Sequence, residues 1–168
     1  PTLGGLRIGK ELNERPTNEP TNERLEWDRD GQYYHYLTKW MHALCKVSRA
    51  TSDPVYTKWA LELAQTAHKG FTYRTPKGKK MYWKMSIDLS HPQVHSMGQH
   101  DPLDGYLTYI ELQIANQNFG QYLPDLTHEI DDMTPICKGM SFYTDDPLGI
   151  GGLLSDAMKA SQLIINSS

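Results

Sequence analysis

The chain has 168 residues, which is the size of one domain with a substantial core. Its 17 basic and 20 acidic residues give a formal charge of −3, a balance that provides no general attraction to nucleic acid or to an anionic membrane. No apolar run approaches the ~18 residues that a membrane-spanning helix needs. The composition therefore favours a globular protein without a nucleic-acid or membrane partner.

The two cysteines, Cys45 and Cys137, match neither zinc-binding nor redox spacing. Cys45 lies within an apolar helical pattern, which predicts a buried free thiol. Free thiols fit a reducing compartment, and no signal peptide precedes the first element, so we expect a cytoplasmic protein. The sequence also contains no phosphate loop, dinucleotide fingerprint or G-x-S-x-G motif, and we expect no cofactor.

The first 25 residues are predicted to be irregular. The stretch 3–9 is interrupted by glycine, and the stretch 13–24 is polar and contains Pro16 and Pro20. Such a segment buries little apolar area. We therefore divide the chain into an irregular segment, 1–25, and a single helical domain, 26–168.

Two helices are predicted to follow as a hairpin. The stretch 30–49 is apolar around most of a helical wheel, so we expect it to be enclosed by other elements. Asp53 and Pro54 then supply an N-cap and a first helical residue. The second helix has one apolar face and stops at Gly70. The pair predicts an αα-hairpin with an inner and an outer arm.

The stretch 71–88 is predicted to be a β-hairpin. Met81, Trp83, Met85 and Ile87 alternate with polar or mixed residues at strand period, and the residues 75–79 supply a turn. The fold class predicted for the chain is thus mostly α, with stacked αα-hairpins and a small β-hairpin insert.

Three further helices are predicted after the hairpin. One opens at Asp101 and carries an apolar stripe from Leu103 to Ile114, a shorter one covers 123–133, and the last opens at Asp146. Asp-Pro pairs start helices at 53, 101 and 146, a spacing of 48 and 45 residues that is typical of stacked helical hairpins. The alternative is that Asp-Pro is simply a good helix opener.

The helix that opens at Asp101 is preceded by a cluster of polar residues. Asp101 and Asp104 have structural roles as the N-cap and the N3 carboxylate, and Gln99 and His100 should lie at the mouth of the helix. An imidazole and two carboxylates at a helix N-terminus can bind hydroxyl groups or transfer a proton. We therefore expect His100, Asp101 and Asp104 to be catalytic and Gln99 to bind substrate.

The other histidines of this loop, His91 and His95, do not form a recognised metal motif. We expect separate hydrogen-bonded loop histidines and no metal, with His95 as a substrate-binding residue.

A second polar cluster is the run Glu26-Trp27-Asp28-Arg29-Asp30. Acids that flank a tryptophan suit a polar ligand stacked on an aromatic face, and glycoside hydrolysis requires two carboxylates at a suitable separation. We expect Asp28 and Asp30 to be catalytic, and Glu26, Trp27 and Trp83 to bind substrate. The alternative is a set of helix-start charges with a surface salt bridge.

The order of elements resembles an α/α toroid, the six-hairpin barrel of several glycosidases and sugar epimerases. The resemblance rests on the hairpin at 30–70, the insert at 71–90 and the restart at Asp101, and no catalytic motif of a named enzyme family matches. The stretches LEWDRDGQYYHYLTKWMHAL and MYWKMSIDLS are similar to those of uncharacterised bacterial proteins of this type. A closed ring takes more than twice this length, so we expect half of a ring, a truncated ring, or an open array that closes by homo-oligomerisation.

Two functions follow from these patterns. The first is a carbohydrate-active enzyme, or a fragment of one, with a sugar as ligand. The second is a non-catalytic helical scaffold that packs against a partner subunit or missing chain. The enzyme hypothesis requires the helices at 33–47 and 103–115 to lie side by side with their amino ends at one hollow.

Overall fold

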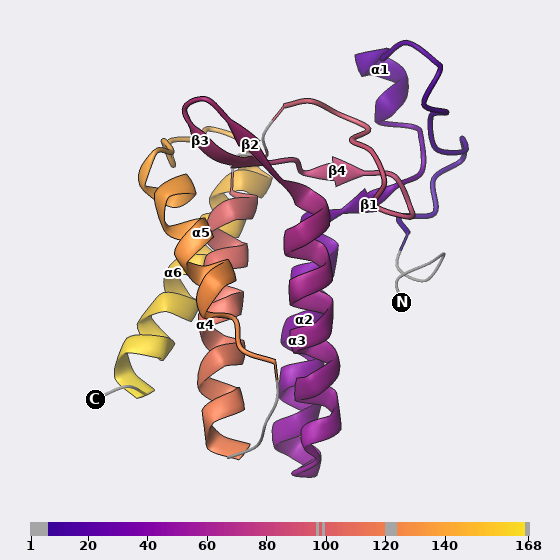
Figure 1. Cartoon of the computed structure of the whole chain (residues 1–168). Coiled ribbons are helices and arrows are strands. Elements are labelled where there is room, and N and C mark those ends of the chain that lie inside the picture. The colour runs from indigo at the N-terminus through magenta and orange to yellow at the C-terminus, as the bar shows by residue number, and fades with distance from the viewer. Residues whose placement is uncertain (1–6, 97, 99, 120–123, 167–168) are drawn as a thin grey trace.

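The computed structural model describes residues 7–96, 98, 100–119 and 124–166. It is mostly helical, as the sequence predicts, and it has two small antiparallel sheets where the sequence predicts one hairpin (Figure 1). The long helices are α2 (Tyr34–Thr51), α3 (Pro54–Phe71), α4 (Asp101–Phe119), α5 (Thr127–Lys138) and α6 (Pro147–Asn166).

The helices α2 and α3 form the predicted hairpin. Ser52 ends α2 in the left-handed conformation, with a φ of 58°. Asp53 then accepts a hydrogen bond from the backbone of Val55 at 2.9 Å, so it is the predicted N-cap, and Pro54 is the first helical residue. A connection of two residues makes the helices antiparallel, and they pack along their length.

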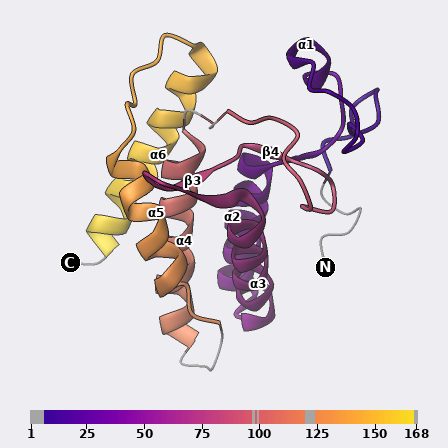
Figure 2. The ribbon, with the colours of Figure 1, turned by 45° about the horizontal axis from the view of Figure 1, so that its top comes forward.

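The centre of the molecule is α4, which packs against α2, α3, α5 and α6 (Figures 1 and 2). It runs parallel to α2, because Tyr34 bonds Tyr109 at 2.8 Å near the amino end of α2, and His42 contacts Glu111 at 2.6 Å further along both helices. Gly105 allows this close approach, since a β-carbon there would collide with the Tyr34 ring. The predicted arrangement of these two helices is therefore confirmed.

The core lies between α2, α3, α4 and α5. It also receives Met81 and Met85 from the strands, and Cys45 is the buried free thiol that the sequence predicts. The largest fully buried apolar side chains are Tyr34, Tyr109, Phe71, Leu37, Met41, Leu61, Met81, Leu112, Leu126 and Met133.

The prediction that the first helix is enclosed on all sides is wrong. Tyr36, Trp40 and Val47 are exposed on α2, and the helix begins at Tyr34 rather than near residue 30. The outer arm of the hairpin and α4 cover only part of its surface. Aromatic side chains on the remaining face therefore reach solvent.

The predicted β-hairpin is correct in its first half only. Strands β2 (Thr72–Thr75) and β3 (Gly78–Met81) pair across a tight turn. The next residues leave this sheet, and β4 (Lys84–Met85) pairs instead with β1 (Gln32–Tyr33), just before α2. In this second sheet Lys84 is buried, and its ammonium group donates to the backbone oxygens of Glu26 and Arg29. The second sheet thereby joins the Trp83 region to the amino end of α2.

Residues 7–22 contain no helix or paired strand beyond one isolated bridge at Leu12, and the single turn α1 (Glu23–Glu26) crosses the predicted boundary at residue 25. Arg15 nevertheless ties this segment down. Its guanidinium donates to Glu26 at 2.7 Å, and its backbone donates to Gln93 at 3.2 Å. An irregular segment thus includes a buried ion pair.

The last helix, α6, places its charged residues against the protein and its apolar residues toward solvent. Its two charged residues, Asp156 and Lys159, face α4, where Lys159 donates to Asp104 at 2.8 Å and to Thr108 at 3.0 Å. On the opposite side, Ile150, Leu154, Met158 and Ile165 are 45%, 67%, 64% and 73% exposed. This outer stripe is apolar and faces solvent. Across the described part of the chain, no helix has the length and apolarity to cross a bilayer.

Candidate functional site

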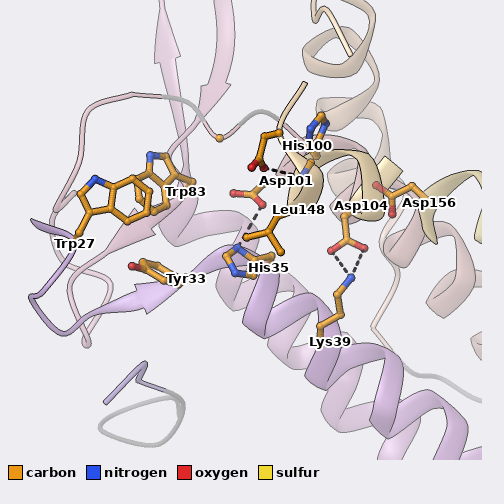
Figure 3. A pocket seen from close by; sticks show the side chains of 14 residues that line it. Trp27, Tyr33, His35, Lys39, Trp83, His100, Asp101, Asp104, Leu148 and Asp156 are labelled. Atoms are coloured by element: carbon orange, nitrogen blue, oxygen red, sulfur yellow. Dashed lines mark hydrogen bonds and ion pairs between the residues drawn. The ribbon is translucent and has the colours of Figure 1, made fainter. Parts of the chain in front are cut away.

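The main pocket lies where the amino ends of α2, α4 and α6 meet (Figure 3). Its volume is about 640 Å³, within the range of ~300–1,000 Å³ that is usual for small-ligand sites. The wall consists of Trp27, Tyr33, His35, Lys39, Trp83, Gly98, His100, Asp101, Asp104, Asp146, Leu148, Gly149, Gly152 and Asp156. The expected hollow at the amino ends of α2 and α4 therefore exists, and α6 adds a third side.

One side of the pocket is an aromatic wall formed by Trp27 and Trp83. Their ring centroids lie 5.3 Å apart at an interplanar angle of 37°, and Tyr33 lies 5.4 Å from the Trp83 ring. The Trp83 ring is fixed by a hydrogen bond to Ser96 at 3.0 Å, whereas Trp27 is 61% exposed. A surface of one fixed and one exposed indole suits the apolar face of a ligand that also has polar edges.

Asp101 lies opposite this wall, in the first turn of α4. The helix begins at Asp101, and the backbone of Asp104 bonds the oxygen of His100, so His100 rather than Asp101 occupies the N-cap position. The predicted capping role is therefore wrong by one residue. The Asp101 carboxylate instead lies 3.6 Å from the His35 ring nitrogen Nδ1, at the start of α2. Gly98 lies against Asp101 and Trp83, where a β-carbon would clash with both.

Asp104 is buried beneath the pocket and joins three helices. Its carboxylate accepts from Thr38 and Lys39 of α2, the latter at 3.2 Å, and from Lys159 of α6. Burial by itself would raise the pKa of Asp104, but Lys159 and Lys39 outweigh it and hold that pKa below its ordinary value. Asp104 is therefore an ionised structural carboxylate at the base of the pocket.

Asp156, on the inner face of α6, is a pocket acid that the sequence patterns did not indicate, and Asp146 at the start of the same helix is another. Burial, with the neighbouring Asp104 carboxylate, raises the pKa of Asp156 to about 6, although Lys159 and Lys39 oppose the shift. Two adjacent carboxylates with different pKa values can share a proton, so one donates while the other stays charged. The signal in the sequence was Asp156 itself, the one acid within α6.

His100 packs against the amino end of α6. Both of its ring nitrogens are buried and have no hydrogen-bond partner among the described residues. Gly149 makes room for the ring, because a β-carbon there would lie 2.8 Å from Nε2. Asp146 caps the same turn by accepting from the Gly149 backbone at 2.7 Å. The predicted His100 is therefore in the pocket wall, with unused hydrogen-bonding capacity.

The acids of the run 26–30 do not line the main pocket. Glu26 is buried in its ion pair with Arg15, and Asp30 accepts from the backbones of Gly9 at 2.7 Å and Gly31 at 2.9 Å. Asp28 is exposed outside the pocket wall. Their catalytic or binding roles stay predictions. Of this run, only Trp27 is in the pocket wall.

A second hollow of about 500 Å³ lies against the aromatic wall, and two further predicted residues, Glu26 and His95, line it. Its lining comprises Thr21, Glu23, Glu26, Trp27, Trp83, Val94, His95 and Ser96. Gln99 lies outside the described residues. His91 is bonded to Ser90 at 3.0 Å, as expected for a loop histidine, and within the described ranges no three metal-ligating side chains converge.

The raised pKa of Asp156 predicts a specific pH dependence of stability. A carboxyl whose pKa rises on folding stabilises the protein below its unfolded pKa, and that contribution is lost as the pH rises through the folded pKa. From 3.8 to about 6, the loss is about 3 kcal/mol. Asp156→Asn should therefore match the wild type near pH 3.5 and be more stable by up to about 3 kcal/mol at pH 7.

Urea unfolding of both proteins between pH 3.5 and 8 measures this difference. The paired comparison removes the contribution of other acids, such as Asp104, whose lowered pKa changes stability in the opposite direction. Parallel profiles for wild type and variant would show that Asp156 titrates normally.

The pocket combines an aromatic surface with two neighbouring carboxylates of different pKa, a third carboxylate beside a histidine, and a buried imidazole. Such groups can stack a ring, bond its hydroxyls and transfer protons to and from it. Comparison of the chain with protein-family models, with curated protein sequences and with solved structures gives no match.

Proposed function

We propose that this chain is a carbohydrate-active protein that binds a sugar in the main pocket and acts on it as a glycoside hydrolase or sugar epimerase does. The observation that carries the proposal is the position of the Trp27–Trp83 wall opposite the carboxylates of α4 and α6. Sugars have an apolar ring face and a polar rim, and this pocket offers one surface for each.

The carboxylates have separate roles in this proposal. Asp156 is the proton donor, because its raised pKa keeps it protonated under mildly acidic conditions. Asp101, which lies 3.6 Å from His35, is the base or nucleophile, and His100 forms part of the pocket wall. Asp104 is a positioning residue that keeps Asp156 and Lys39 in place. Glycoside hydrolysis needs one acid and one base of this kind.

The helix arrangement supports the finer fold proposal of a partial α/α toroid. The helix α3 covers α2 and α5 covers α4, while α2 and α4 run parallel with their amino ends at the pocket. These pairs are the repeating unit that a toroid would use. The outer stripe of α6 is then the place that the next covering helix would occupy.

Removing the exposed half of the aromatic wall tests ligand binding. Trp27→Ala should weaken sugar binding by about tenfold, because a ring stacked on an indole loses its largest contact surface. Isothermal titration calorimetry with glucose, galactose, mannose, xylose, N-acetylglucosamine and their disaccharides measures the change. Trp59→Ala on α3 is the matched control, since Trp59 is also exposed but lies outside the pocket. The absence of binding by every sugar would contradict the proposal.

The outer stripe of α6 favours a second candidate function, the helical scaffold. Four large apolar side chains face solvent there, and both charges of the helix point inward. Burying roughly 100 Å² at each of four positions on two copies removes on the order of 800 Å², which corresponds to a weak interface. The occupant that we propose is a second copy, whose own α6 offers the same uncharged stripe.

Sedimentation equilibrium tests this self-association. At about 0.5 mM the wild type should be substantially dimeric, and the double variant Leu154→Lys and Met158→Lys should be monomeric. The exposed substitution Glu62→Lys on α3 is the control and should leave the dimer intact. A wild type that remains monomeric at this concentration would rule out the scaffold built from two copies.

A further inference from the structure

We infer that the ligand is an oligosaccharide of at least two sugar units that crosses the aromatic wall and occupies both the main pocket and the second hollow. This inference rests on the proposed function, and it specifies the substrate class. A single-sugar ligand would use the main pocket alone.

The two hollows share the aromatic wall. Trp27 and Trp83 are the residues that line both, and each of the two hollows has a volume suited to a small ligand. The aromatic wall therefore lies between two adjoining hollows, and each hollow uses it as one side. A linear chain that stacks on the wall can extend a sugar unit to either side, whereas a compact ligand leaves one compartment to solvent.

The second hollow has the chemistry of a binding compartment. Glu23, His95, Ser96 and Thr21 provide a carboxylate, an imidazole and two hydroxyls, which are the donors and acceptors that sugar hydroxyls require. Its other acid, Glu26, is already held by Arg15 at 2.7 Å, with Lys84 at 3.8 Å. An acid engaged by two cations is poorly suited to proton transfer, which leaves Glu23 without a second available carboxylate in this hollow. Because glycoside hydrolysis needs two carboxylates, we assign binding rather than reaction to this hollow.

The reacting bond then lies at the other end of the ligand. The carboxylates of Asp101, Asp104 and Asp156 all line the main pocket. A sugar unit in the second hollow contributes binding energy that is remote from the reacting atoms and orients the bond at the carboxylates. The order of compartments thus predicts action at the unit held in the main pocket.

Length dependence of binding tests the inference. The probes are glucose, cellobiose and cellotriose, with the matched series xylose, xylobiose and xylotriose, and N-acetylglucosamine with chitobiose. For the series that binds, we expect calorimetry to show at least tenfold tighter binding of the disaccharide than of the monosaccharide. The double variant Glu23→Ala and His95→Ala should lose that gain.

The matched control is His128→Ala, an exposed histidine on α5 outside both hollows, which should keep the full gain with length. Thermal unfolding of each variant verifies that it is folded. Equal affinity for the monosaccharide and the disaccharide, or a gain that survives in the double variant, would overturn the inference and leave the proposed function standing. If no sugar of any length binds, the proposed function itself fails.

Discussion

Asp104→Ala is expected to destabilise the protein by about 3 kcal/mol, because it removes the anion that two helices share through Lys159 and Thr38. Lys159 is largely buried, and loss of its partner leaves a positive charge in a poorly hydrated place. The cost is at the lower end of the range for a broken buried pair, since Lys39 is exposed to water and Asp156 remains nearby. Urea unfolding at pH 7 measures the change.

Glu62→Ala is the control for this experiment. Glu62 forms an exposed pair with Lys58 at 3.9 Å on α3, and its removal should change stability by less than about 0.5 kcal/mol. If Asp104→Ala were as stable as this control, the buried cluster could not be what ties α6 to α4.

The second large effect is the loss of hydrolytic activity in Asp156→Asn, which should depend on the leaving group of the substrate. If Asp156 is the proton donor, the variant should hydrolyse its disaccharide substrate on the order of 10²–10⁴ times more slowly. Hydrolysis of the matching p-nitrophenyl glycoside should fall far less, because p-nitrophenolate leaves without a proton. Turnover numbers on the two substrates measure the difference.

Asp101→Asn provides the comparison, because loss of the base or nucleophile should slow both substrates alike. The Asp156→Asn variant should also be the more stable protein at pH 7, so its low activity cannot come from unfolding. Equal losses on the two substrates in Asp156→Asn would contradict its assignment as the acid.

The sequence was sufficient to predict the helices and the common end at which two of them meet. Asp-Pro pairs mark real helix starts at Pro54 and Pro147, and near Asp101, since a carboxylate and a fixed φ favour a helix amino end wherever they occur. These helix-start signals depend only on neighbouring residues, so they can be recognised without knowledge of the fold. The mostly helical prediction is confirmed for the same reason.

The same sequence patterns could not predict which side chains from distant segments contact one another. Glu26, next to Trp27, does not line the main pocket. It forms an ion pair with Arg15, which lies in a segment that the sequence patterns describe as irregular. Lys84 is buried although the alternating pattern places it on the polar face of the strand, because its ammonium group donates to the backbone of Arg29. Asp156 joins the pocket only because α6 turns its charged side inward. Each of these depends on a contact between segments that are distant in the chain.

The meeting of three helix amino ends has one more consequence. Each end carries a partial positive charge, and the acids of the pocket, among them Asp101, Asp104 and Asp146, belong to or precede the first turns of α4 and α6. The helix dipoles therefore offset part of their negative charge before a ligand binds. The arrangement of acids is maintained by folding itself, so the cavity should be preorganised when empty.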